Sequence, residues 1–227
     1  ASGGFFHADG KAKMLPITPP APVAMPAGHQ LRLNTGRVRD HWHTMTRTGR
    51  APRLGAHMAE PYVELHPEDA AVLGLGDAGL AVVENARGRA TLRVLITPKA
   101  QKGSAFVPMH WTGETAAGGR VNTLVDAVTD PVSGQPASKG STVSVRPFEA
   151  AWYGFAASDS AMRPTRPYAA IARSKTGWRA EVAGCKTPRD WEAEARSVLN
   201  LGGGTASVVE DPATGVARVA ISDDGIL

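Results

Sequence analysis

The stretch PYVELHPEDAAVLGLGDAGLAVVENARGRATLRVLIT, residues 61–97, decides the fold class. Its first apolar run, residues 62–65, predicts a strand. Residues 66–74 predict a short helix, because Pro67 suits a first helical turn, acidic residues follow it, and Gly74 ends the run. Strand and helix are both only a few residues long, which is typical of a small β-rich domain.

The rest of this stretch predicts a pair of strands. The apolar runs 80–85 and 90–96 flank residues 86–89, whose composition suits a hairpin turn. Strands are also predicted before and after this stretch, at 30–34, 104–108 and 141–146. Short strands with few, small helices predict a compact barrel over residues 1–149.

The sequence ahead of these strands is less regular. Asp9 and Gly10 lie between two strand-like runs within residues 1–15 and predict a hairpin. Five prolines within residues 16–26 exclude regular helix and central strand and predict a connector. The start at Ala1 has neither an initiator Met nor a signal-peptide pattern, so we expect it to be the middle of a longer chain.

Residues 150–227 predict a second, small α+β unit with the order ββαββ. A strand pair around a turn at Lys175–Gly177 precedes a helix that Thr187 caps and Pro188 opens, ending near Asn200. Two more strands follow the glycines after that helix. The predicted strands of this unit are 168–173, 178–184, 206–211 and 216–222. The last five residues resemble a turn into another strand, so we expect this unit to be truncated.

Composition excludes several classes of protein. Apolar residues make up 42% of the 227 residues, enough for a core, yet no run approaches the length of a membrane span. The net charge of +4 is spread over scattered Lys and Arg, which favours a solvated surface over nucleic-acid binding. The single cysteine, Cys185, excludes an internal disulfide, an iron–sulfur cluster and a Cys-rich zinc site within this chain. It favours a cytoplasmic setting, and Cys185 itself is predicted to be a buried small residue.

The densest polar segment is NTGRVRDHWHTMTRT, residues 34–48, directly after a predicted strand. Its three arginines, two histidines and four threonines are the donors that a pyrophosphate requires, and Gly36 lets backbone approach a ligand. A solvated polar loop is the alternative. His41 and His43 lack a third metal ligand at diagnostic spacing, so structural or ligand-bonding roles are favoured. No P-loop, dinucleotide fingerprint or nucleophile elbow is present, and no catalytic residue is assigned.

Three later loops complete a recognisable order. They are PMHW at 108–111, GRVNTL at 119–124 and DPVSGQPASK at 130–139. Together with the leading FHADGKA, the L-x-T-G-R and H-W-H-T-x-T-R-T segments and the H-P-x-D-A-x-x-L-G helix, they resemble the molybdopterin-dinucleotide-binding C-terminal domain of the dimethyl-sulfoxide-reductase family. The amino-acid sequence of residues 34–48 and 130–139 most resembles the corresponding segments of bacterial assimilatory nitrate reductases.

The resemblance implies a mainly β fold: a six-stranded double-psi β-barrel with short helices, followed by the small α+β unit. It implies bis(molybdopterin guanine dinucleotide) with molybdenum as cofactor and reduction of nitrate to nitrite by oxygen-atom transfer. By similarity, the cofactor-binding residues are Thr35, Gly36, Arg37, His41, His43, Thr44, Thr46, Arg47, His110, Trp111, Asn122 and Lys139.

The same resemblance places the molybdenum ligand and any iron–sulfur cluster in upstream domains of the same polypeptide. The isolated chain is therefore expected to be inactive and to depend on those domains and on an electron-donor protein or reductase subunit. Two alternatives stay open. One is the same domain of a formate dehydrogenase or related molybdenum enzyme. The other is a cofactor-free double-psi barrel that binds protein or nucleic acid.

Overall fold

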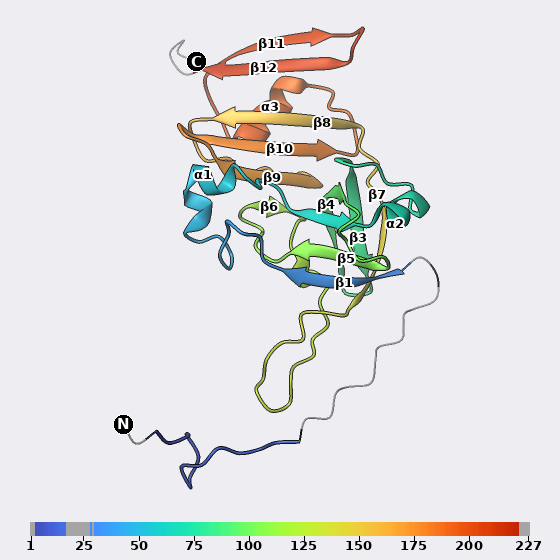
Figure 1. The fold of residues 1–227 in the computed structure, drawn as a ribbon. Helices are drawn as coiled ribbons and strands as arrows, with labels where there is room; N and C mark the ends of the chain where they lie inside the picture. Colours follow the sequence, from blue (N-terminus) through green and yellow to red (C-terminus); the bar gives the residue numbers. More distant parts are fainter. Residues whose placement is uncertain (1–2, 17–27, 29, 223–227) are drawn as a thin grey trace.

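The computed structural model describes residues 3–16, 28 and 30–222 (Figure 1). Most of the predicted proline-rich connector and the predicted strand entrance after Ser222 lie outside these residues. The hairpin predicted within residues 1–15 is wrong. Residues 3–16 contain a turn, in which the Gly10 amide donates to the His7 carbonyl at 2.8 Å, but no strand. Phe5 and Phe6 are exposed there, and an isolated two-stranded hairpin without a packed apolar face is only marginally stable in water.

Six strands close into a barrel, which confirms the expected fold class. Around the barrel the order is β1-β5-β2-β4-β3-β7. The pairs β1–β5 and β2–β4 are parallel, and the other neighbours are antiparallel. The strands are β1 (Gln30–Gly36), β2 (Tyr62–Leu65), β3 (Leu80–Asn85), β4 (Gly88–Ile96), β5 (Ser104–Pro108) and β7 (Thr142–Pro147).

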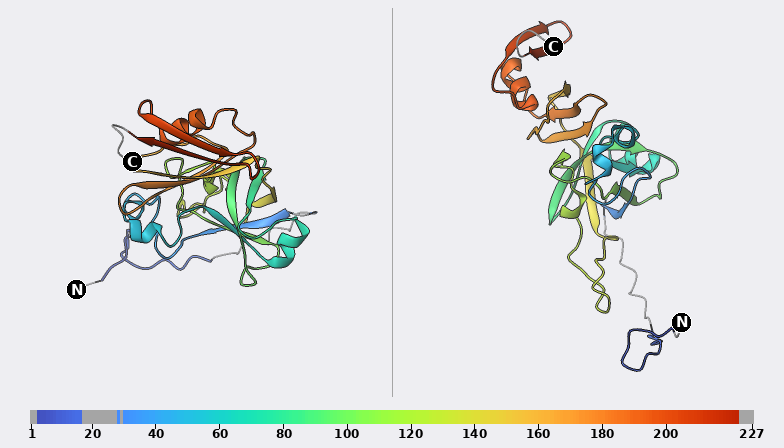
Figure 2. Two further views of the ribbon diagram at one scale, coloured as in Figure 1. Left: turned by 90° about the horizontal axis from the view of Figure 1, so that it is seen from above. Right: turned by 90° about the vertical axis from the view of Figure 1, so that its left-hand side faces the viewer.

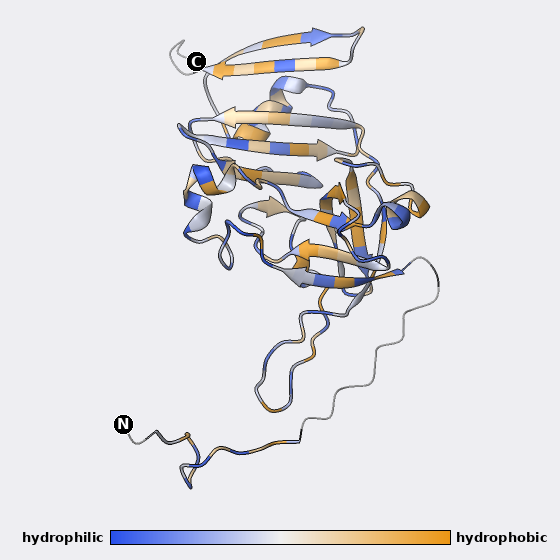
Figure 3. Ribbon diagram, in the orientation of Figure 1, coloured by the Kyte–Doolittle hydropathy of each residue, from blue (hydrophilic) through white to orange (hydrophobic). Residues whose placement is uncertain are grey.

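Alternating residues of these strands fill the barrel interior. Leu33, Leu65, Val83, Leu92 and Val107 are each almost completely buried and belong to one apolar cluster. Burying such a side chain stabilises the fold by about 1.5–3 kcal/mol. Figure 3 shows apolar residues recurring along the barrel strands. The barrel is therefore a packed core, and a ligand must bind at its ends or outside.

One end of the barrel collects most of its long connections. Strands β1 and β5 run toward this end and β4 and β7 start from it, as the pairing directions require. We call it the loop end. It is formed by residues 37–59 after β1, 109–124 after β5, and 126–141 before β7.

The helices of this half are short. Helix α2 (Pro67–Val72) confirms the predicted helix, and the His66 side chain caps it by accepting a hydrogen bond from the Glu68 amide at 3.2 Å. At the loop end lie η1 (Thr48–Arg50), α1 (Pro52–Gly55) and η2 (Val121–Thr123).

A second sheet with the order β6-β9-β10-β8 stands beside the barrel (Figures 1 and 2). Helix α3 and the two-stranded sheet β11–β12 follow it, and the right-hand view of Figure 2 shows barrel, sheet and hairpin in succession. The bounds are β6 (Ala116–Ala117), β8 (Trp152–Ser158), β9 (Tyr168–Arg173), β10 (Trp178–Gly184), α3 (Trp191–Leu199), β11 (Thr205–Asp211) and β12 (Val216–Ser222). The predicted ββαββ order is present, with β8 and β6 as additional strands.

Two details of this half correct the sequence analysis. Helix α3 is capped by Asp190, whose carboxylate accepts from the Ala193 amide at 3.0 Å, and not by Thr187. Cys185 is exposed and not buried, because it follows Gly184, the last paired residue of β10. The thiol therefore takes no part in the packing against α3.

Candidate functional site

The two central segments of the site follow directly after the parallel strands β1 and β5. Gly36 at the end of β1 is level with Pro108 at the end of β5, and the Met109 amide donates to the Gly36 carbonyl at 2.9 Å. Segments 37–48 and 109–112 therefore leave the barrel side by side. A side chain on Gly36 would place its Cβ 2.7 Å from the Phe106 ring, so glycine permits this close approach.

His110 fastens the two segments together. Its ring is fully buried, its Nδ1 lies 2.6 Å from the His43 carbonyl oxygen, and its Nε2 accepts from the Val38 amide at 2.9 Å. These partners require the neutral tautomer with the proton on Nδ1. Burial lowers the pKa of His110 below its usual value, against the opposing effect of the bond to His43. His110 thus positions residues 38–43, since both of its ring nitrogens are engaged with backbone.

His41 and Trp111 form a buried floor beside His110. The His41 ring lies 5.6 Å from the Trp111 ring and 5.8 Å from the His110 ring, centre to centre. His41 Nε2 is 3.1 Å from the Met58 carbonyl oxygen. Both side chains are almost fully buried, so they support the segment above them more than they present polar atoms to solvent.

The donors above this floor are exposed. Arg37, His43, Thr44, Thr46 and Arg47 all present their side chains to solvent. The Arg37 guanidinium lies 4.7 Å from the centre of the Trp42 ring, and the Thr44 and Thr46 hydroxyls are 3.1 Å apart. Exposed charged and hydroxyl donors on a rigid buried support form a surface suited to an anionic ligand.

The backbone under these donors is strained. His43 has φ 45° and Met45 has φ 61°, both in the left-handed region that side chains disfavour. Each such residue costs on the order of 1–3 kcal/mol. Burial of Met45 and the hydrogen bond from His110 to the His43 carbonyl hold this conformation.

The third segment of the loop end brings in Lys139. Its ammonium donates to Asn34 Oδ1 at 2.9 Å and to the Thr35 carbonyl, and the Thr35 hydroxyl donates to the Ser138 carbonyl at 2.8 Å. Thr35 is buried, so this contact joins β1 to the loop before β7. Lys139 therefore lies at the end of β1, with its ammonium held by the oxygens of Asn34 and Thr35.

Asn122 is the most peripheral of the predicted residues. It is exposed in η2, whose neighbour Thr123 lies against the start of β4, where a Cβ on Gly88 would meet the Thr123 carbonyl at 3.0 Å. The start of β4 also belongs to the loop end. The structure thus brings all twelve predicted residues to one end of the barrel.

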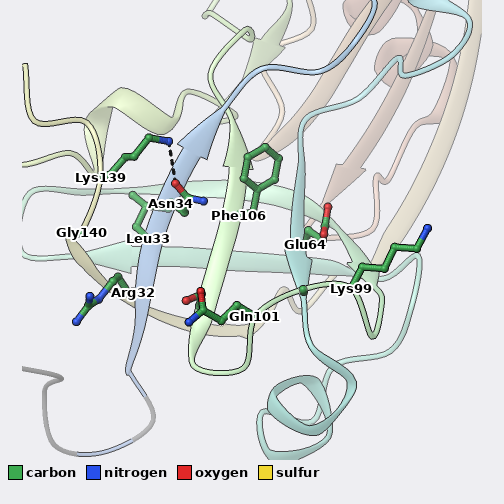
Figure 4. Close-up of a pocket in the computed structure, with 11 residues that line it drawn as sticks. Arg32, Leu33, Asn34, Glu64, Lys99, Gln101, Phe106, Lys139 and Gly140 are labelled. Carbon is green, nitrogen blue, oxygen red and sulfur yellow. Dashed lines mark hydrogen bonds between the residues drawn. The ribbon is translucent and has the colours of Figure 1, made fainter.

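Two hollows adjoin these residues. One, of about 430 Å³, lies on the outside of the barrel along β1 and β5 (Figure 4), and Lys139 is the only predicted residue that lines it. The other, of about 820 Å³, lies between residues 41–59 and the second sheet. His41, Thr44, Thr46 and Trp111 line this larger groove.

The groove also contains residues that the sequence analysis missed. Arg50 comes from η1, and Arg163 and Arg173 come from the second sheet and the loop before it. Arg39 of the polar segment is engaged elsewhere, since it pairs with Asp40 at 2.8 Å and lowers the pKa of that carboxyl. No local motif marks these arginines. Only the folding of the second sheet against the loop end brings them together.

Among the described residues, no three His, Cys, Asp or Glu side chains gather as a metal-binding group. In the same part of the chain, no helix has the length and apolar character to cross a membrane.

Residues 31–142 match the family model described as the molydopterin dinucleotide binding domain. This part of the chain belongs to that family. The match begins within β1 and ends at the first residue of β7, so it contains the other barrel strands and every predicted site residue, but not the rest of β7. The second sheet and the hairpin that follow lie beyond it.

Several curated proteins are similar to this chain. A nitrate reductase of Klebsiella oxytoca is 47% identical over 66% of this chain and 17% of its own length. The assimilatory nitrate reductase catalytic subunit of Bacillus subtilis is 35% identical over 63% of this chain and 20% of its own length. The F420-dependent formate dehydrogenase 1 subunit alpha of Methanococcus maripaludis is 36% identical over 45% and 14%. The chain therefore spans a fifth or less of these relatives.

Similarity to solved structures is weaker. Acetylene hydratase from Pelobacter acetylenicus superposes with a TM-score of 0.46 and 20% identity, over 52% of this chain and 18% of that one. A match at this level is too distant to inform the positions of individual side chains.

The donor set fits the family's cofactor. A pterin dinucleotide carries a pyrophosphate and flat heterocycles with many hydrogen-bonding edges. Arg37, Arg47, His43 and the paired hydroxyls of Thr44 and Thr46 offer charged and neutral donors on one surface, and Trp42 offers an aromatic face there. These are the groups that such a ligand requires.

Proposed function

We propose that the loop end holds a molybdopterin guanine dinucleotide that carries molybdenum, and that the chain is the C-terminal part of a nitrate reductase. The proposal rests on the exposed hydrogen-bond donors of residues 37–47. Their backbone is held by the buried His110 ring, which forms hydrogen bonds with the Val38 amide and the His43 carbonyl. A prearranged set of charged donors binds a pyrophosphate with little loss of conformational entropy.

The roles of the residues follow from their exposure. Arg37 and Arg47 bind the phosphates, and His43, Thr44 and Thr46 donate to phosphate or pterin oxygens. The buried residues His41, His110 and Trp111 keep the support dry and rigid. Each charge-assisted hydrogen bond contributes roughly 1.5–3 kcal/mol to such binding. Lys139 adds a cation at the end of β1, and Asn122 binds from the rim.

The bound molybdenum group supplies oxygen-atom transfer, which converts nitrate to nitrite with two electrons and two protons. This chain's residues orient and hold the group, while the metal ligand and iron–sulfur cluster belong to upstream domains of the same polypeptide. The isolated chain is accordingly inactive. An electron-donor protein or reductase subunit supplies electrons to the whole enzyme. The enzyme is cytoplasmic.

Cofactor content of the full-length enzyme tests the binding role. Arg37→Ala and His43→Ala each lower molybdenum and pterin per polypeptide, and Arg218→Ala in the exposed part of β12 leaves both unchanged. Unchanged content in Arg37→Ala and His43→Ala would refute the assignment. Metal content by mass spectrometry and pterin by fluorescence of its oxidised form give independent readings.

A second candidate function is that of a formate dehydrogenase, because one relative at 36% identity carries that name. Reduced-viologen assays of the full-length enzyme separate the two. Oxidation of the viologen by nitrate supports the nitrate reductase. Reduction of oxidised viologen by formate, with no reaction toward nitrate, would support the alternative.

A further inference from the structure

A carboxylate joins the barrel to the second sheet. Glu60, shortly before β2, accepts hydrogen bonds from Nε of Arg93 in β4 at 3.0 Å and from its Nη2 at 2.7 Å. The Tyr168 hydroxyl of β9 donates to the same oxygen, Glu60 Oε2. Arg93 also donates to the Ala78 carbonyl at 3.0 Å, and its guanidinium lies 5.4 Å from the centre of the Tyr168 ring. We call the side chains of Glu60, Arg93 and Tyr168 the Glu60 contact.

The Glu60 contact is largely shielded from water. Tyr168 is 1% exposed and belongs to an apolar cluster with Leu80 of β3, and the Arg93 and Glu60 side chains are 24% and 23% exposed. Burial raises the pKa of Tyr168, so its hydroxyl keeps its proton and remains a donor to Glu60. Hydrogen bonds to a charged group in such surroundings are stronger than those between neutral groups in water, so the contact fixes the position of Glu60.

Glu60 is connected through the chain to the buried support of the donor residues. Two residues before it, the Met58 carbonyl oxygen lies 3.1 Å from His41 Nε2. His41 is almost fully buried within the segment of exposed donors, residues 37–47, and its ring meets Trp111 edge-on. Only Ala59 separates Met58 from Glu60. The Glu60 contact therefore fixes the carbonyl that orients the His41 ring.

Other hydrogen bonds tie the second sheet to the same loops. The Arg179 guanidinium of β10 donates to the Gly55 carbonyl of α1 at 3.3 Å. The Ile171 amide of β9 donates to the Thr115 carbonyl at 2.8 Å, and β6 pairs with β9. Figure 1 shows β9 next to both α1 and β6. The second sheet thus holds the loop after β1 and the loop after β5, which together contain most of the predicted site residues.

We infer that the second sheet controls how firmly the cofactor is retained, with Tyr168, Glu60 and Arg93 as positioning residues for His41 and the donors beside it. The inference rests on the proposed function, because it concerns retention at that same site. Each of the three acts through the Met58 carbonyl and not as a donor to the ligand. Strands β8, β9 and β10 lie outside the residues matched to the family, so this control comes from a part of the chain beyond the matched domain.

Histidine NMR of the full 227-residue chain tests the positioning step. Tyr168→Phe removes only a hydroxyl, and Tyr153→Phe makes the same change at an exposed position of β8 as the control. The imidazole nitrogen resonances of His41 should be displaced in Tyr168→Phe and unmoved in Tyr153→Phe. Unmoved His41 resonances in Tyr168→Phe would overturn the inference. If circular dichroism shows that Tyr168→Phe does not fold, Glu60→Gln tests the same contact, because glutamine keeps the size but loses the charge that Arg93 pairs with.

Cofactor retention by the full-length enzyme tests the functional step. During prolonged dialysis, Tyr168→Phe enzyme should lose molybdenum and pterin roughly fivefold faster than Tyr153→Phe enzyme, the effect expected for one hydrogen bond. Equal rates of loss would overturn the role in retention, even with displaced His41 resonances. Failure of the proposed function looks different. It would leave cofactor content unchanged in Arg37→Ala and His43→Ala, while the His41 resonances, which are measured without cofactor, would still move in Tyr168→Phe.

Discussion

His110→Phe is the perturbation that tests how the site is held together. Phenylalanine fills a similar volume but leaves the Val38 amide and the His43 carbonyl without their partner, now 2.9 and 2.6 Å away. An orphaned buried polar group costs about 1–3 kcal/mol. Because His43 is exposed, its carbonyl can turn to water, so the total should be about 2–4 kcal/mol.

Urea denaturation of the full chain measures this loss. His7→Phe, a change of the same kind at an exposed position, is the control and should shift the free energy of unfolding by less than about 0.5 kcal/mol. Amide hydrogen exchange localises the effect. In the variant the Val38 amide should exchange much faster, while amides of the barrel strands should keep their relative order of protection.

The pH dependence gives a second reading of the same contact. The folded pKa of His110 lies below the unfolded value, so protonation disfavours the folded state. The His110 contribution is therefore intact above about pH 6.5, the ordinary histidine value, and is lost as the pH falls below it. The stability difference between the unaltered chain and His110→Phe should shrink over that range. A difference in the free energy of unfolding of less than about 0.5 kcal/mol at pH 8 would refute this role of His110. A difference that does not change with pH would refute it as well.

Three other substitutions each test one local feature: a close packing contact, a helix cap and a site residue. Gly177→Ala should lower the free energy of unfolding by about 1–3 kcal/mol, because the new Cβ would lie 2.1 Å from the Ser158 carbonyl oxygen. Gly202→Ala is the control: its Cβ would meet nothing within 4 Å, so the melting temperature should not change. Asp190→Ala should cost about 1 kcal/mol through loss of the α3 cap, and an equal loss in Thr187→Ala would contradict the assigned cap. Lys139→Met should lower cofactor content of the full-length enzyme while shifting unfolding by about 1 kcal/mol or less, since its side chain is exposed, and undiminished content would remove Lys139 from the site.

The barrel could be predicted from the sequence because its strands carry their own burial pattern. Runs such as 62–65 and 80–85 are apolar wherever they lie, and the glycine and proline around them mark their ends. Strand β8 carries no such pattern, since Tyr153 and Phe155 face solvent while Trp152 faces the core. Strand β6 is only two residues long and exists because it pairs with β9.

The site was predictable in composition but not in architecture. The donor side chains of residues 34–48 are visible in the sequence, and their composition alone favours an anionic ligand. That His110 holds this segment through Val38 and His43 depends on β1 and β5 being parallel neighbours, which no local pattern reveals. The groove arginines were missed for the same reason, because Arg163 and Arg173 line the same groove as Thr44 only through the packing of the second sheet.

Hydrogen exchange of the full-length enzyme, with and without its cofactor, tests the central claim most directly. If the loop end holds the molybdopterin dinucleotide, amides of residues 35–48 and 109–112 should exchange at least tenfold more slowly in the loaded enzyme. Residues 205–222, in the distant hairpin, should not change. Equal exchange of residues 35–48 in the loaded and empty enzyme would contradict the account.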